Sequence, residues 1–489
     1  MVMKQHLGRR LGWGVISHET MDGQAFTQNR NAAHESSHRL GLAVNDPSTL
    51  NRIGWHVMLM PIDKIRLHRL ADVKPKSKRC LGQRRNINKG EHAMPYNFDE
   101  IIDRTGTNAM NTDGFRDYLF QGADLTFPYA DDEFIRMWVA DMEFASPPEV
   151  IQAVKARLDK RIFGYTKVFD PKYYEALAHW TQKHYDWTFQ KEHLVTSNGI
   201  VPALYDLVDY LCQPDDKVLI VTPSYAFFKH AVDYHHRELV TSDLANQAGY
   251  YTINFDDLEA KAKDEKVSLC IFCNPHNPSG RVWTREELQR VGDICLENNV
   301  WVISDEIHCD LLRNGETHTP LAKLFPETDR IITCMAPSKT FNMAGFMFSN
   351  VIIPNEQIRA VWQARHYGLD NPLSIAAAQA AYQYGDEWLA QLKSYLDDNF
   401  AVLKEYLDRH LPQAIFRIPE ATYLAWVDIG AYLPEEQNLS LFFAQNAGVL
   451  LEGGNMFVAN SDGHIRLNVA CPRSVLEEGL KRISHALLR

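Results

Sequence analysis

The sequence predicts an α/β protein, built around a mostly parallel β-sheet that helices cover on both faces. Five short runs, rich in Val, Ile and other apolar residues, have the length and composition of buried strands. Helical patterns separate several of these runs, and this alternation is typical of a parallel sheet. A polar residue closes or follows four of the runs, where such sheets bind ligands. The predicted strands are 217–223, 267–275, 300–306, 330–337 and 349–354.

Length and composition are those of a soluble protein with more than one domain. The chain has 489 residues, of which 45% are hydrophobic and 23% are charged, as in ordinary globular proteins. No apolar run reaches the roughly 18 residues that a membrane-spanning helix needs. The 8 cysteines are scattered along the chain, which is typical of reduced thiols. We therefore expect a cytoplasmic protein with no membrane partner.

Residues 1–93 differ from the rest of the sequence. They contain 16 Lys and Arg against 7 Asp and Glu, a net charge of +9, while the whole chain has −11. They show no hydrophobic period, and the basic run 73–90 is typical of solvated sequence. We interpret them as a disordered or atypical extension, or as translated sequence ahead of a natural start at Met94. A nucleic-acid-binding tail and a transit peptide are the alternatives, whereas the acidic body argues against nucleic-acid binding there.

The sequence from residue 94 onward is expected to fold throughout. One helix is predicted at 284–299, because Thr284 is a favourable N-cap. Two further strands are predicted at 421–429 and 464–470, in a smaller α+β domain. The expected division is an N-terminal segment that joins the small domain (94–142), a large domain (143–375) and the small domain itself (376–489).

Two cysteines form a C-x-x-C pattern inside the predicted strand 267–275. Cys270 and Cys273 are an odd number of residues apart, so on a strand their side chains point to opposite faces. We therefore expect both to pack in the core, and we predict no metal site.

The four polar residues at the strand ends are Tyr225, Asn277, Asp305 and Lys339. Lys339 lies in the string APSKTFNMAG, in a predicted loop, and a lysine there can form a Schiff base. Asp305 ends an apolar strand, where an unpaired carboxylate is costly to bury and a protonated pyridine nitrogen would compensate it. Asn277, rather than the neighbouring Asn274, is predicted to bind a phenolic oxygen. These are the groups that pyridoxal phosphate (PLP) requires.

The remaining parts of a PLP site can also be proposed from the residues. The helix predicted near 197–211 would direct the N–H groups of Gly199, Ile200 and Val201 at a phosphate, and Ser338 would add a hydroxyl. Tyr225 could stack on the pyridine ring. Arg466 lies in an apolar strand, where a buried guanidinium suits the α-carboxylate of an amino-acid substrate.

Residues 94–489 resemble the fold-type I PLP enzymes of the aspartate aminotransferase superfamily, and within them the MalY/PatB class of cystathionine β-lyases. The resemblance implies a large domain with a seven-stranded type of sheet and a smaller α+β domain. It gives Lys339 the Schiff-base role, and assigns Asp305, Asn277, Tyr225 and Arg466 as above. The matching strings are 96–113, 138–150, 163–166, 304–311, 338–345 and 423–426.

Three positions carry further implications of the resemblance. Tyr165 matches a tyrosine that reaches the phosphate of the neighbouring subunit, which implies a homodimer with shared active sites. His308 stands where aminotransferases usually carry a tyrosine to the phenolic oxygen, and Met347 where many carry a phosphate-binding arginine. Both departures resemble the lyase branch.

The function that the resemblance implies is a PLP-dependent carbon–sulfur lyase. Such an enzyme would cleave cystathionine, or a related L-cysteine S-conjugate, to a thiol, pyruvate and ammonia. A PLP-dependent aminotransferase is the nearest alternative, since it also begins by removing the Cα proton. A regulatory role is the third reading, because a MalY-type enzyme can also bind a transcription activator.

Overall fold

The computed structural model describes residues 96–433 and 438–489. They belong to one compact unit that runs from Gly90 to Arg489. The predicted extension at 1–93 lies outside the described residues, and so does Cys80. The division of the remaining chain into a large and a small domain stays a prediction.

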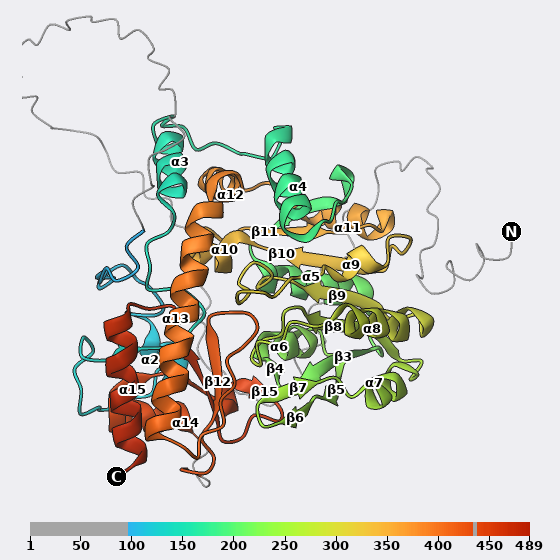
Figure 1. The fold of residues 1–489 in the computed structure, drawn as a ribbon. Coiled ribbons are helices and arrows are strands. Elements are labelled where there is room, and N and C mark those ends of the chain that lie inside the picture. The colour runs from blue at the N-terminus through green and yellow to red at the C-terminus, as the bar shows by residue number, and fades with distance from the viewer. Residues whose placement is uncertain (1–95, 434–437) are drawn as a thin grey trace, which may run out of the picture. The chain divides into compact units, whose positions relative to one another are not determined.

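A seven-stranded sheet forms the centre of the fold, with the strand order β2-β11-β10-β9-β8-β3-β5 (Figure 1). All pairs of neighbours run parallel except those of β11, which is antiparallel to β10 and β2. The prediction of a mostly parallel α/β sheet is therefore confirmed. The strands are β2 (Leu194–Ser197), β3 (Lys217–Thr222), β5 (Glu238–Asp243), β8 (Val267–Cys273), β9 (Trp301–Asp305), β10 (Ile331–Met335) and β11 (Ser349–Ile352).

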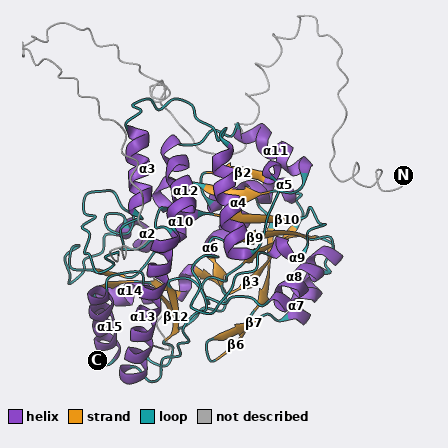
Figure 2. Ribbon diagram, turned by 45° about the horizontal axis from the view of Figure 1, so that its top comes forward, coloured by secondary structure: helices purple, strands orange, loops and turns teal. Residues whose placement is uncertain are grey.

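The sheet is buried on both faces, which explains why its strands are continuous apolar runs. One core contains Ile271 and Cys273 of β8, and the other contains Cys270 and Phe272. The two cysteines therefore lie on opposite faces, as their odd spacing predicts. Helices lie on both sides of the strands in Figure 2. The first core is completed by α5 (Ile200–Leu211), α6 (Ala226–Tyr234) and α11 (Glu356–His366), and the second by α7 (Phe255–Ala262), α8 (Arg285–Glu297) and α9 (Leu321–Leu324).

The helix boundaries follow from local capping. Thr284 accepts a hydrogen bond from the backbone N–H of Glu287, whose side chain in turn accepts from the N–H of Thr284. This capping box satisfies two N–H groups at the start of α8. The predicted helix at 284–299 is therefore confirmed, with Thr284 as its N-cap.

A second region follows, built on a three-stranded sheet with the order β12-β16-β14. Its core combines this sheet with three helices, and residues 135–137 join this region because β1 pairs with β13 and Met137 packs in the core. The predicted strands at 421–429 and 464–470 correspond to β12 and β16. The elements are β1 (Ile135–Arg136), β12 (Leu424–Asp428), β13 (Val449–Leu450), β14 (Glu452–Gly453), β16 (His464–Asn468), α13 (Asp386–His410), α14 (Leu439–Ala447) and α15 (Arg473–Leu487).

The remaining elements connect and cover these two regions. Within the described ranges, none of the helices is long and apolar enough to cross a membrane. They are α2 (Phe115–Phe120), α3 (Pro148–Leu158), α4 (Pro171–Tyr185), α10 (Pro337–Thr340), α12 (Pro372–Tyr384), the 3-10 helices η3 (Lys191–His193), η4 (Ala344–Phe346) and η5 (Gly454–Met456), and the short strands β4 (Ser224–Tyr225), β6 (Ala245–Gln247), β7 (Tyr250–Thr252) and β15 (Phe457–Val458).

Candidate active site

The structure brings together ten of the eleven residues that the sequence predicts for the site. They line one cavity of about 200 Å³ beyond the carboxyl ends of β8, β9 and β10, with Arg466 reaching it from β16 of the second region. Tyr165 is the exception. The ten residues are Gly199, Ile200, Val201, Tyr225, Asn277, Asp305, His308, Ser338, Lys339 and Arg466.

Lys339 lies in the single-turn helix α10, not in a loop as predicted. Pro337 and Ser338 begin this turn directly after β10, and proline is favoured at such a start. The Lys339 Nζ donates a hydrogen bond to the carbonyl oxygen of Ala140. Burial lowers the pKa of Lys339 from 10.5 to about 8, although nearby Asp141 opposes this shift. A lysine with this pKa is neutral for part of the time near pH 7, as a nucleophile or base must be.

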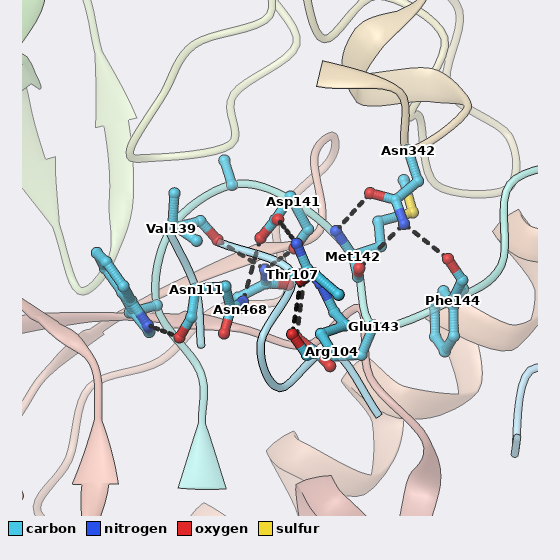
Figure 3. Close-up of polar contacts among 12 residues, drawn as sticks. Arg104, Thr107, Asn111, Val139, Asp141, Met142, Glu143, Phe144, Asn342 and Asn468 are labelled. Atoms are coloured by element: carbon cyan, nitrogen blue, oxygen red, sulfur yellow. Dashed lines mark hydrogen bonds and ion pairs between the residues drawn. The ribbon is translucent and has the colours of Figure 1, made fainter. Parts of the chain in front are cut away.

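A network of side chains, drawn in Figure 3, fixes the loop 139–144. This loop presents the carbonyl oxygen of Ala140 to Lys339. Arg104 forms ion pairs with Asp141 at 2.7 Å and with Glu143 at 3.4 Å. Asn468 of β16 donates to the carbonyl oxygens of Val139 and Asp141, at 2.8 and 2.6 Å. The loop is thus tied both to the N-terminal segment and to the second region.

Asn342, which follows α10, holds the far side of the same loop. Its Nδ2 donates to the carbonyl oxygens of Met142 and Phe144, at 3.0 and 2.6 Å, and its Oδ1 accepts from the N–H of Met142 at 2.9 Å (Figure 3). Sequence reasoning gave these residues no role, although the string WVADMEFASPPEV contains the loop. The sequence feature that could have indicated a role for this loop is its pair of carboxylates, Asp141 and Glu143, flanked by apolar residues.

Asp305 is a buried carboxylate with no ion-pair partner among the described residues. Its Oδ1 accepts a hydrogen bond of 3.2 Å from the N–H of Ile307. Burial raises the pKa of Asp305 to about 7. A cationic partner would stabilise the ionised form, and the protonated nitrogen of a pyridine ring fits this requirement.

Asn277 is oriented by Arg466. The Asn277 Oδ1 accepts a hydrogen bond of 2.9 Å from Arg466 Nη1, so its Nδ2 remains as a donor in the cavity. A deprotonated phenolic oxygen needs such a donor. Asn274, the competing candidate, donates instead to the carbonyl oxygen of Thr319 at 3.0 Å and does not line the cavity.

The start of α5 offers a cradle for an anion. Gly199, the N-cap, has φ of 112°, a conformation that favours glycine, and no side chain caps the helix. The first N–H groups of the helix are therefore available, and they stabilise negative charge. Met347 lies beside Gly199, since a Cβ on Gly199 would be 3.8 Å from its Cε. The uncharged side chain of Met347 thus lies at the position where many aminotransferases carry a phosphate-binding arginine.

His308 is buried and uncharged. Burial, with Lys339 and Arg466 nearby, lowers its pKa to about 3. Its Nδ1 lies buried without a hydrogen-bond partner among the described residues. A polar group bound in this cavity would give the Nδ1 of His308 a hydrogen-bond partner. Asp305, Asn277, the α5 start and His308 together fit PLP.

Tyr165 does not approach the cavity of its own chain. It is 97% exposed, in a segment where Ile162, Phe163 and Phe169 are also exposed. Among the lining residues to which sequence reasoning gave no role are two with polar side chains, Tyr118 and Glu452. The signal for Glu452 was a lone carboxylate inside the apolar run GVLLEGG.

Comparisons with known proteins agree with this geometry. The family of class I and II aminotransferases matches residues 133–483. Cystathionine β-lyase PatB of Bacillus subtilis is 39% identical, over 80% of this chain and all of the relative, and protein MalY of Escherichia coli is 30% identical, over 80% and 99%. Among solved structures, a PLP-bound C–S lyase from Staphylococcus hominis is 53% identical with a TM-score of 0.78, and cystalysin from Treponema denticola, which contains PLP, is 33% identical with a TM-score of 0.75. Each of these two covers 81% of this chain and 99% of its own.

Proposed function

This chain belongs to the family of class I and II aminotransferases, within the branch of PatB and MalY, and on this premise we propose that it is a PLP-dependent carbon–sulfur β-lyase. Its substrate is cystathionine or a related L-cysteine S-conjugate, and its products are a thiol, pyruvate and ammonia. The observation that carries the proposal is the single cavity that holds Lys339, Asp305 and Asn277 in a chain 39% identical to a cystathionine β-lyase.

Different residues of the cavity would bind different parts of PLP. Asp305 would keep a proton on the pyridine nitrogen, Asn277 Nδ2 would donate to the phenolic oxygen, and Tyr225 would pack against the ring. The N–H groups at the start of α5 and the Ser338 hydroxyl would hold the phosphate. When bound, PLP supplies an electron sink that makes the Cα–H bond of an amino acid acidic.

The remaining residues act on the substrate. Arg466 binds the α-carboxylate, which orients the Cα–H bond toward Lys339. Lys339, held by the carbonyl oxygen of Ala140 in a buried site, removes the Cα proton as its neutral amine. The Cβ–S bond then breaks, and the departing sulfur takes up a proton, which balances the one that Lys339 removed, and leaves as a thiol. The three-carbon product hydrolyses to pyruvate and ammonia.

A product assay with cystathionine as the only substrate tests this function against the aminotransferase alternative. A β-lyase releases equal amounts of pyruvate and homocysteine over many turnovers, because it needs no second substrate. A transaminase stops after one turnover unless a keto acid is added. Dependence of the reaction on a keto acid would overturn the lyase assignment.

The proposal also includes assembly and location. Two copies would share their active sites, with Tyr165 of each serving the other, and its 97% exposure supports this arrangement. The seven described cysteines carry free, buried thiols, which supports a cytoplasmic location. A regulatory role alongside catalysis stays a prediction.

A further inference from the structure

A second, larger cavity adjoins the cofactor cavity. It has a volume of about 810 Å³, against about 200 Å³ for the first. Polar residues such as Gln121 and Asn455 belong only to the outer cavity. The two cavities share four lining residues, and we refer to the place where the cavities meet at these residues as the passage: Tyr118, Tyr225, Glu452 and Arg466.

Glu452 is the acidic residue of this passage, and β-sheet register places it there. Glu452 on β14 and Arg466 on β16 are directly opposed in the ladder, so their side chains lie on the same face. Glu452 Oε2 accepts a hydrogen bond from Arg466 Nη2. The side chains are only 7% and 3% exposed. Glu452 Oε1 makes no hydrogen bond to any residue that the structure describes, although the residue lines both cavities.

The charges of this passage change when a substrate binds. Without substrate, the carboxylate of Glu452 balances the guanidinium of Arg466. A substrate α-carboxylate bound to Arg466, as in the proposed function, would share one guanidinium with Glu452. A buried carboxylate that loses part of its counter-charge is unfavourable. A cation placed beside Glu452 would compensate its charge.

The departing arm of the substrate is the part that can supply this cation. With the Cα held near Lys339 and the carboxylate on Arg466, the outer cavity offers space for the group beyond sulfur, and Glu452 lines that space. Lys229, which lines that cavity, already pairs with Asp233 at 2.5 Å, so its charge is balanced. Among the described residues that line the outer cavity, Glu452 is the one carboxylate, and its Oε1 is a free acceptor.

We propose that Glu452 is a specificity residue, which favours L-cysteine S-conjugates whose departing arm carries an ammonium group. The inference rests on the proposed function, since it concerns the choice among substrates of that reaction. The same pairing positions Arg466, and through it the Oδ1 of Asn277.

Two conjugates of matched shape test the inference with the PLP-loaded enzyme. S-(2-aminoethyl)-L-cysteine and S-propyl-L-cysteine differ only by an ammonium in place of a methyl group. We measure kcat/KM for thiol release from each, and compare their ratio between variants because the two thiols differ as leaving groups. Glu452→Gln should lower the preference for the aminoethyl arm about tenfold, the effect of losing one charge-assisted hydrogen bond.

Two further variants serve as controls. Glu452→Asp keeps the charge and should retain more of the preference than Glu452→Gln does. Glu238→Gln makes the same chemical change at the first residue of β5, at the opposite ends of the strands from the site, and should leave the ratio unchanged. An unchanged ratio in Glu452→Gln overturns the inference.

A measurement on the unaltered enzyme covers the case in which Glu452→Gln does not fold. L-lysine and L-2-aminoheptanoate have the same arms with carbon in place of sulfur, so neither has a leaving group. L-lysine should be the stronger competitive inhibitor, and equal inhibition would overturn the inference. If neither conjugate yields thiol and pyruvate, the proposed function itself fails, which is a different result from cleavage of both without preference.

Discussion

At the scale of single residues, burial accounts for the state of the site's charged groups. Asp305 and His308 are buried and Lys339 is half-buried, and each pKa is shifted in the direction that favours the uncharged form of the group. Near pH 7, His308 is therefore uncharged, and Asp305 and Lys339 are each uncharged for part of the time. Two predictions follow from these individual groups.

Replacing Asp305 by Asn should slow turnover strongly. An amide cannot keep the pyridine nitrogen protonated, so the electron sink weakens. Loss of one such charge-stabilising contact typically lowers the rate by roughly 100- to 1000-fold. Pyruvate release by the PLP-loaded variant is the measurement, and near-normal turnover would contradict the role of Asp305.

Uptake of PLP by the cofactor-free protein should rise with pH between about 6 and 8.5. Asp305 has a raised pKa of about 7, so it gains its useful negative charge above that pH. Lys339 has a lowered pKa of about 8, so its amine becomes increasingly neutral as the pH passes that value. Uptake can be followed by absorbance, with attachment to Lys339 shown by borohydride reduction and peptide mapping. In Asp305→Asn, the part of the rise in PLP uptake near pH 7, which the ionisation of Asp305 causes, should disappear. A rate of PLP uptake that does not change with pH in the unaltered protein would contradict both assignments.

At the scale of elements, the site depends on a loop that is held from three sides. Residues 139–144 are bound by Arg104 from the N-terminal segment, by Asn468 from β16 and by Asn342 after α10. These anchors come from three distant parts of the chain. The loop can therefore set the position of the Ala140 carbonyl, and with it that of Lys339, only when all three have folded.

Asn342→Ala should loosen this loop. The change removes three hydrogen bonds and leaves the Met142 and Phe144 carbonyls without these donors. We expect a loss of roughly 1–3 kcal/mol in the free energy of unfolding, together with faster loss of PLP on dialysis. Asn355→Ala is the control, because Asn355 caps α11 and its loss should lower stability by about 1 kcal/mol while PLP is retained. Equal PLP retention in both variants would show that the loop does not position Lys339.

At the scale of the whole molecule, exposed apolar residues give a physical reason to expect the proposed dimer. Tyr165 and its apolar neighbours Ile162, Phe163 and Phe169 are between 52% and 97% exposed in the single chain. Such a cluster on a surface often marks a protein interface. At the phosphate end of the cavity, the described part of the chain places the uncharged side chain of Met347 beside Gly199.

Mixing two inactive variants tests whether the sites are shared. Lys339→Ala removes the base from its own site, while Tyr165→Ala removes a contact from the partner's site. If subunits exchange at random, a mixed dimer has one complete site, so about a quarter of the wild-type activity should return. Each variant alone is the control, and the absence of recovery after verified exchange would contradict shared sites.

The sequence alone determined the class of fold and most of the site. Its buried strands were readable because apolar runs alternate with capped helices, and Thr284 begins α8 as expected. Asp305, Asn277 and Lys339 were recognisable because strand ends in a parallel sheet meet at one edge, and because their chemistry matches one cofactor. These features are local, so they can be read from neighbouring residues.

Tertiary structure decided the contacts between distant parts of the chain. Asn277 and Arg466 are 189 residues apart in sequence, yet their hydrogen bond determines which atom of the amide faces the cavity. The pairing of Glu452 with Arg466 depends on the register of β14 against β16, and the Ala140 contact on a loop 199 residues before Lys339. The antiparallel direction of β11 and the helical turn at Lys339 are also outcomes of packing. No local pattern specifies them, because each depends on which surfaces meet once the chain has folded.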